Sequence, residues 1–150
     1  MTLKTLSALI NLLRSLCIVA GLMGTLTIIV LSLVPGTLRP HTGAGGDAEH
    51  WLAYAMVALS FGLGSRRGRT YLMTGTLMSA GSGLLELAQN FVPGRNAGLA
   101  GFIASSLGAW IGLGIAVALL AFFGLFVKTG QASPAASVQR PVPATADDNT

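Results

Sequence analysis

The stretch Leu84–Arg95 reads LLELAQNFVPGR and joins the end of one hydrophobic run to the start of the next. It places the carboxylate of Glu86, two amides and the guanidinium of Arg95 close together, in a chain with only 9% charged residues. Pro93 removes a backbone donor and Gly94 permits a positive φ, so a helix before them has to end here. The stretch therefore predicts a turn between two hydrophobic helices, with polar groups gathered beside it.

The composition indicates an integral membrane protein. Hydrophobic residues make up 52% of the chain, and the mean hydropathy is +0.69. Soluble domains carry about 25% charged residues, so this chain has too few to cover a water-soluble surface. The net charge of +4 comes from basic residues that lie singly or in one short cluster between hydrophobic runs, which indicates membrane topology and no nucleic-acid partner. The single cysteine, Cys17, excludes an intramolecular disulfide and a zinc site built from paired cysteines.

Four hydrophobic runs approach or exceed the ~20 residues that a helix needs to cross the membrane. We predict an all-α fold, a four-helix transmembrane bundle within residues 13–127, with spans at about 13–34, 48–64, 70–90 and 99–126. Residues 1–12 are expected to be a cytoplasmic N-terminus, and residues 128–150 a disordered cytoplasmic tail. A cleaved signal peptide is the competing interpretation of the first run, but its core should be only ~7–15 residues long.

Lysine and arginine in short loops mark the cytoplasmic side of a membrane protein. One side of the predicted bundle collects Lys4, Arg14, Arg66, Arg67, Arg69 and Lys128, and the other side collects Arg39 and Arg95. We therefore expect a multi-pass protein of the bacterial inner membrane, with both termini cytoplasmic and the loops 35–50 and 91–98 facing outward. His50 and Glu86 then lie at the same outer level of the membrane.

Small residues at four-residue spacing indicate faces on which helices pack closely in lipid. These candidate packing residues are Gly75, Ser79 and Gly83 in the third span, and Ala104, Gly108 and Gly112 in the fourth. Continued along the third span, the same face reaches Glu86 and Gln89. We therefore expect Glu86 to face another helix and not lipid.

The outer-level polar residues are candidates for binding a lipid headgroup or another anion. They are Arg95, His50, Glu86, Gln89 and Tyr54. Glu86 is either wet near the interface, or buried and paired with Arg95 or His50. Arg95 either reaches up to headgroup phosphates or binds an anionic headgroup by bidentate hydrogen bonds. His50 is either structural or a titratable ligand, with Tyr54 one turn deeper on the same helix face.

No catalytic template is present, since the sequence has no G-x-S-x-G elbow, H-E-x-x-H helix or phosphate loop. His50 and Glu86 are the only candidates for a general base, and we expect no cofactor. A metal held by Asp47, His50 and Glu86 is conceivable, but their spacing matches no known metal motif. Asp47 and Glu49 are equally explained by the positive end of the helix dipole.

Three segments together resemble the VanZ-like membrane proteins: LSLVPG (31–36), EHWLAY (49–54) and ELAQNFVPGR (86–95). The resemblance covers roughly residues 31–112, and its most specific part is the E…Q…PGR segment. It implies a small multi-span protein of the bacterial cell envelope. The name-giving member of the family is associated with low-level resistance to the lipoglycopeptide teicoplanin. The resemblance supplies no catalytic residues.

This chain also departs from the family pattern. The matching positions are Glu86, Gln89, Arg95, His50 and Tyr54. Where family members often have Asp and Lys before the histidine, this chain has Gly46 and Asp47. Where they commonly have Asp and Asn after the PGR arginine, it has Gly101 and Ser105. The outer polar cluster is therefore thinner here than the resemblance implies.

Three hypotheses for the function follow. The favoured one is a non-enzymatic envelope protein that interacts with lipid or lipid-linked cell-wall precursor headgroups through Arg95, His50 and Glu86. The second is an enzyme that acts on a lipid headgroup, with His50 or Glu86 as general base. The third is an assembly protein whose small-residue strips bind a second copy or another membrane helix. A transporter is disfavoured, because four short spans without internal duplication offer little for alternating access.

Overall fold

The computed structural model describes residues 2–38, 43, 45–65, 68–95 and 97–130. Its elements, in chain order, are α1 (Leu3–Leu33), the one-turn 3-10 helix η1 (Gly36–Leu38), α2 (Gly46–Gly64), α3 (Gly68–Gln89) and α4 (Leu99–Gly130). The all-α class predicted from the sequence is confirmed. Of the tail expected at 128–150, the first residues end α4, and residues 131–150 lie outside the described part of the chain.

α1 begins at Leu3 and not near residue 13, so most of the expected N-terminal segment is helical. The Oγ1 atom of Thr2 accepts the N–H of Thr5 at 3.3 Å and caps the first turn. No proline or glycine interrupts the chain from there to Gly21. Hydropathy located the membrane-length part of this helix, but the cap decides where the helix starts.

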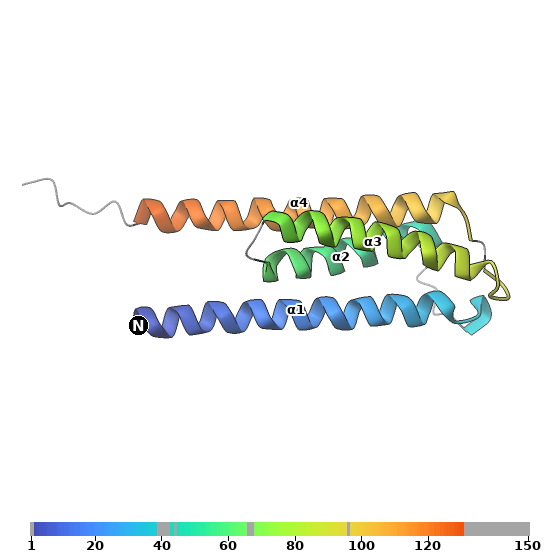
Figure 1. Ribbon diagram of the computed structural model, residues 1–150, viewed down its shortest axis with the longest axis horizontal. Coiled ribbons are helices and arrows are strands. Elements are labelled where there is room, and N and C mark those ends of the chain that lie inside the picture. The colour runs from blue at the N-terminus through green and yellow to red at the C-terminus, as the bar shows by residue number, and fades with distance from the viewer. Residues whose placement is uncertain (1, 39–42, 44, 66–67, 96, 131–150) are drawn as a thin grey trace, which may run out of the picture.

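The four long helices lie side by side and run alternately up and down (Figure 1). α1 and α4 have 31 and 32 residues, whereas α2 and α3 have 19 and 22. The two longer helices extend past the shorter ones at the end of the bundle where the N-terminus lies (Figure 1). The opposite end carries the turns at Pro35-Gly36 and Pro93-Gly94, and we call it the Pro-Gly end.

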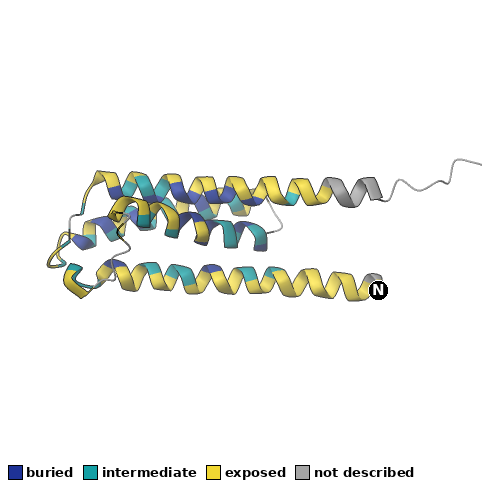
Figure 2. Ribbon diagram, turned by 180° about the vertical axis from the view of Figure 1, so that it is seen from behind, coloured by how far each residue is buried: buried dark blue, intermediate teal, exposed yellow. Residues whose placement is uncertain are grey.

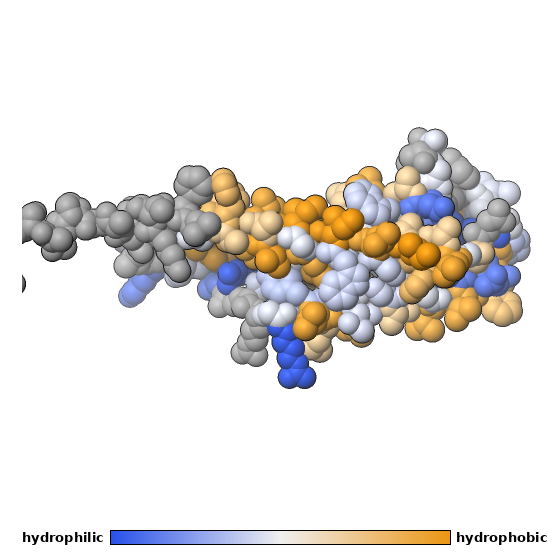
Figure 3. Space-filling view, turned by 90° about the horizontal axis from the view of Figure 1, so that it is seen from above, coloured by the Kyte–Doolittle hydropathy of each residue, from blue (hydrophilic) through white to orange (hydrophobic). Residues whose placement is uncertain are grey.

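Two of the helices are long and apolar enough to cross a membrane: α1 over Lys4–Leu33 and α4 over Leu99–Gly124. In the most apolar window of α1 only 11% of the residues are buried, so this helix is unlike the core helix of a soluble protein. Figure 2 shows exposed residues along most of α1, and Figure 3 shows hydrophobic side chains along the length of the bundle. The outer surface of the helices is therefore chemically suited to lipid.

The closest helix contact is between α2 and α4. A Cβ atom added to Gly108 would lie 2.2 Å from the carbonyl oxygen of Trp51, and one added to Gly112 would lie 2.1 Å from that of Ala55. Backbone therefore lies against backbone, which only a residue without a side chain permits. Ala104, at the start of the same strip, is partly exposed. The small-residue strip of α4 is thus covered by α2 within the same chain.

The small-residue strip of α3 makes room for aromatic rings. Gly75 lies against the indole ring of Trp110, which would be 2.7 Å from a Cβ atom added there. Gly83 lies 3.5 Å from the ring of Phe102 by the same measure, and Ser79 between them is partly buried. The strips of α3 and α4 therefore take different partners instead of packing against each other.

α1 packs mainly on α2 and makes few contacts with α3. Gly21 of α1 receives the ring of Phe61, Gly24 receives the side chain of Val57, and Gly64 of α2 receives Ile18. Since α2 lies between α1 and α4, it is the element on which the bundle is assembled. The sparse contact between α1 and α3 leaves space between these two helices.

Candidate functional site

The two turns at the Pro-Gly end have the same sequence, Val-Pro-Gly, at 34–36 and 92–94. The N–H of Gly36 donates to the carbonyl oxygen of Pro93 at 3.2 Å. A Cβ atom on Gly36 would lie 2.1 Å from the carbonyl oxygen of Gly94, and Gly94 itself has φ +71°. Both glycines are therefore required, one for close approach and one for its backbone conformation. This contact was not predicted, although the repeated tripeptide was a visible signal.

Arg95, the residue after this second turn, holds the end of α1. Its guanidinium Nη2 donates to the backbone carbonyl of Leu31. The last four carbonyls of a helix have no partner inside the helix and carry the negative end of its dipole. A permanent cation at that place stabilises the helix end and fixes the α3–α4 turn beside it. The sequence predicted that Arg95 would reach headgroup phosphates or bind an anionic headgroup; it did not predict that Arg95 would hold a helix end.

Glu86 faces α4, as expected from the small-residue face. Its side chain is buried, and Oε2 accepts the N–H of Gly98 at 2.8 Å. Gly98 immediately precedes α4, so the carboxylate lies at the positive end of that helix. A Cβ atom on Gly101 would lie 2.2 Å from Oε1 of Glu86. The glycine at this position, where the VanZ-like pattern has Asp, is what gives the carboxylate its room.

Gln89 lies one turn beyond Glu86 on α3 and is also buried. Its Nε2 atom has no hydrogen-bond partner among the described residues. The neighbouring Asn90 is exposed, and its amide donates to the carbonyl oxygens of Glu86 and Leu87 at 3.2 and 3.3 Å. Glu86 and Gln89 thus belong to the buried side of α3, whereas Asn90 caps the end of that helix.

A cavity of about 270 Å³ lies between α1 and α2 near the Pro-Gly end; its lining is mostly apolar, and we call it the polar cavity after the polar and charged residues that contribute to that lining. Its polar lining residues are Thr27, Ser32, Glu49, His50, Tyr54 and Arg95. It brings together three of the five predicted site residues: His50 and Tyr54 from α2, and Arg95 from the turn that follows α3. Glu49, expected only to complement the helix dipole, lines it as well.

Tyr54 links the polar cavity to Glu86. Its side chain is 5% exposed, lines the cavity, and lies within electrostatic reach of the Glu86 carboxylate. His50 lies one turn before it on the same face of α2, as predicted. Of the two candidate general bases, His50 lines the cavity, whereas the Glu86 carboxylate accepts a hydrogen bond at the start of α4.

The charges around the polar cavity suit a phosphate-bearing group. Arg95 supplies a permanent planar cation, and His50 can carry a second positive charge near neutral pH. Glu49 adds a carboxylate that suits an ammonium or hydroxyl group. Among the described residues, no three His, Cys, Asp or Glu side chains gather closely enough to hold a metal ion. The set Asp47, His50 and Glu86 is therefore not assembled.

Comparison of the chain with protein-family models, with curated proteins and with solved structures finds no match in any of the three.

Proposed function

We propose that the protein is a VanZ-like, four-span protein of the bacterial inner membrane whose polar cavity binds a phosphate-bearing lipid headgroup at the outer face, without catalysis. The observation that carries the proposal is the lining of one cavity by His50, Tyr54 and Arg95, which are distant in sequence. Its ligand is a membrane lipid or a lipid-linked envelope precursor.

The dimensions of the shorter helices support four crossings. At 1.5 Å per residue, α2 and α3 are about 29 and about 33 Å long, close to the ~30 Å of the hydrocarbon core. Both expose large apolar side chains, including Met56 of α2 and Leu77 of α3, at 61% and 67%. A helix with such a surface is more stable in lipid than in water. We infer that α2 and α3 cross the membrane together with α1 and α4.

The distribution of charge supports the orientation. Lys4 and Arg14 on α1 and Arg69 on α3 all lie towards the end opposite the Pro-Gly end. By the positive-inside rule, that end is cytoplasmic and the polar cavity opens near the outer face. An outward cavity meets the headgroups of the outer leaflet, where a cation beside a histidine favours phosphate.

Arg95 is already held in place before a ligand arrives. Its guanidinium bonds to Leu31, and its backbone N–H donates to the carbonyl of Val92 at 3.3 Å. A cation that is fixed in advance loses less conformational entropy on binding than a free side chain does. Glu86, grouped with the binding residues from the sequence, acts by fixing the start of α4 and not by touching the headgroup.

The other two hypotheses receive less support. An enzyme would need a positioned general base; the Glu86 carboxylate is buried against Gly98 and Gly101, which leaves His50, of the two candidate bases, as the one that lines the cavity. An assembly surface made of Gly108 and Gly112 would have to displace α2, which covers both. Headgroup binding needs neither change, which is why we prefer it.

Lipid retention by the purified protein tests the proposal. Native mass spectrometry would compare bound phosphatidylglycerol with bound phosphatidylcholine for wild type, Arg95→Gln and the matched control Arg69→Gln at the opposite end. We expect wild type and Arg69→Gln to retain the anionic lipid preferentially, and Arg95→Gln to lose at least fivefold of that preference. His50→Gln should lose part of it below pH 6, where histidine is charged. Equal lipid preference in wild type and Arg95→Gln, with both variants folded by circular dichroism, would overturn it.

A further inference from the structure

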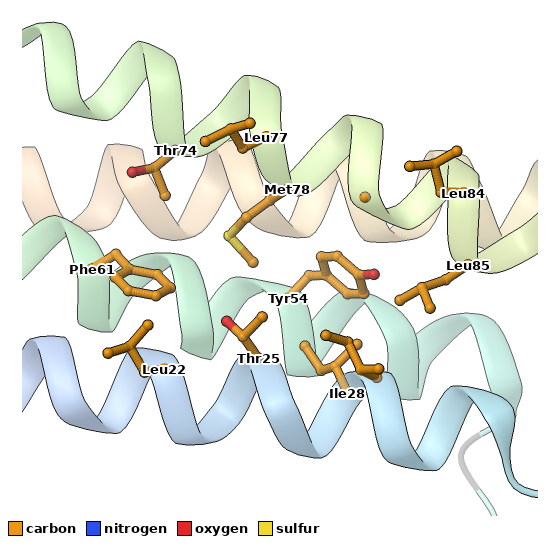
Figure 4. Close-up of a pocket in the computed structure, with 12 residues that line it drawn as sticks. Leu22, Thr25, Ile28, Tyr54, Phe61, Thr74, Leu77, Met78, Leu84 and Leu85 are labelled. Atoms are coloured by element: carbon orange, nitrogen blue, oxygen red, sulfur yellow. The ribbon is translucent and has the colours of Figure 1, made fainter.

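A second cavity, also lined mostly by apolar atoms, adjoins the polar cavity. It has a volume of about 520 Å³ and runs between α1 and α3 over α2; we call it the α1–α3 groove (Figure 4). Its lining includes Leu22, Ile28 and Ile29 of α1 and Leu77, Met78 and Leu85 of α3. Leu22 and Leu77 are 54% and 67% exposed, so the groove opens sideways through its rim. In a membrane this opening faces the hydrocarbon of the lipid.

Ile28 and Tyr54 line both cavities. Figure 4 shows the ring of Tyr54 between Ile28 and Leu85, with its hydroxyl oxygen directed towards the Pro-Gly end. The wall common to the two spaces is therefore apolar on the groove side and polar at the tip that points towards the headgroup level. A molecule that filled both spaces would need a charged head and a hydrocarbon chain.

The length of the groove matches one leaflet. On α3 its lining extends from Thr74 to Leu85, which is about 17 Å at 1.5 Å per residue. Half of a ~30 Å hydrocarbon core is about 15 Å. The groove therefore accommodates the chain of a single acyl group in the outer leaflet, whereas a long polyprenyl chain would extend beyond it.

We propose that the α1–α3 groove seats one acyl chain of a glycerophospholipid whose phosphate lies in the polar cavity. This inference rests on the proposed headgroup binding and extends it, because it assigns the ligand's chain a place inside the protein. Charge complementarity at Arg95 and His50 positions the head, and the shared wall at Tyr54 directs the chain between α1 and α3. The ligand therefore enters sideways from the bilayer, through the side on which α1 and α3 make few contacts.

Gly81 offers a direct way to close the groove. It lines the groove, and a Cβ atom added to it would meet nothing within 4 Å. Gly81→Leu therefore fills the space of the chain without a clash in the bundle. Gly114→Leu on α4 is the matched control, because Gly114 is also helical, faces open space and lies outside the groove.

The test is photocrosslinking in nanodiscs with phosphatidylglycerol that carries a diazirine in its acyl chain. Adducts at Met78 and Tyr54, mapped by mass spectrometry, report occupancy of the groove. We expect labelling at both residues in wild type and Gly114→Leu, and at least a fivefold loss in Gly81→Leu. If Met78 is not labelled in wild type, or is labelled equally in wild type and Gly81→Leu, the proposal that the groove holds an acyl chain is overturned.

Two further arms separate the chain from the headgroup. If Gly81→Leu loses the adducts and Arg95→Gln loses the preference for phosphatidylglycerol over phosphatidylcholine, both proposals are supported. If Arg95→Gln keeps that preference, headgroup binding in the polar cavity fails, whatever the pattern of adducts. A diazirine-bearing polyprenyl phosphate that labels Met78 more strongly than phosphatidylglycerol does would overturn the assignment of an acyl chain.

Discussion

α2 and α4 approach until backbone touches backbone, whereas α1 and α3 leave a groove of about 520 Å³ between them. The difference follows from the side chains on the facing surfaces. α4 presents Gly108 and Gly112 to α2, while the rim between α1 and α3 is made of long side chains such as Leu22 and Leu77. In lipid there is little hydrophobic force to close a gap between helices, so close packing depends on small residues.

The same comparison separates structure from function within the bundle. The α2–α4 contact fixes two helices relative to each other, with backbone against backbone at Gly108 and Gly112. The α1–α3 side leaves a space, and the polar cavity next to it, nearer the Pro-Gly end, is lined by charged side chains. The bundle therefore has a closed half, where α2 and α4 pack tightly, and an open half, where α1 and α3 leave the space that we propose holds a lipid chain.

Gly112→Leu should have the largest effect, because it breaks the closed half. The new Cβ would lie 2.1 Å from the carbonyl oxygen of Ala55, so α2 and α4 must separate. Overpacking costs about 1–3 kcal/mol where side chains can adjust; here backbone is the obstacle, and we expect about 3 kcal/mol or more. Thermal unfolding in detergent measures the loss.

The control for that substitution is Gly114→Leu, two residues along the same helix, where a Cβ meets nothing within 4 Å. It should unfold at the wild-type temperature or above. If Gly112→Leu matched it in stability but changed the oligomeric state, the strip would bind a second copy and not α2.

Gly101→Asp should have the next largest effect, and it tests the contact between α3 and the start of α4. It introduces an acidic residue where the VanZ-like pattern has one, but the new Cβ would lie 2.2 Å from Oε1 of Glu86. Steric and charge repulsion together should cost about 2 kcal/mol. A double-mutant cycle with Glu86→Ala checks the cause, because the two substitutions should then couple by about 1 kcal/mol. Additive effects would mean that Gly101 and Glu86 do not interact.

Arg95→Gln should have a smaller effect, confined to the Pro-Gly end of the bundle. It removes the charged hydrogen bond to the carbonyl of Leu31 at the end of α1. Such bonds contribute about 1.5–3 kcal/mol, and we expect about 1.5 kcal/mol because Arg95 is partly exposed. Hydrogen exchange should speed up at the amides of Val34 and Gly36, and not at those in the middle of α1. Uniform exchange along α1 would contradict the capping role.

The sequence alone predicted the number and approximate place of the long helices, but not where α1 starts or which helices pack together. Hydropathy and the Pro-Gly turns predicted four helices, and the small-residue face correctly turned Glu86 towards another helix. Four-residue spacing, however, specifies a face and not the helix that packs on it. For that reason the covering of Gly108 by α2, and the insertion of Trp110 against Gly75, appeared only in the structure.

The site was predicted in the same partial way. His50, Tyr54 and Arg95 were all grouped as candidate binding residues near the outer face, and they line one cavity. The bond from Arg95 to Leu31 was not foreseen, because a carbonyl at a helix end has no signature in the sequence. The groove was missed for a related reason: its walls are ordinary leucines and isoleucines, and only the spacing of α1 from α3 makes them a cavity.

Gly81→Leu should have the smallest effect on stability. The size of the change in unfolding temperature should depend on whether a lipid chain fills the α1–α3 groove. Leucine is a better helix former than glycine by up to about 1 kcal/mol, and its side chain enters the α1–α3 groove without a clash. In lipid-free detergent the variant should therefore unfold at a higher temperature than wild type. In phosphatidylglycerol nanodiscs the gain should shrink, because the leucine displaces an acyl chain that already stabilises the wild-type groove. Gly114→Leu faces open space on α4 and should show the same shift in both media. An equal gain for Gly81→Leu in both media would mean that the groove holds no stabilising lipid, and that the open half differs from the closed half in packing alone.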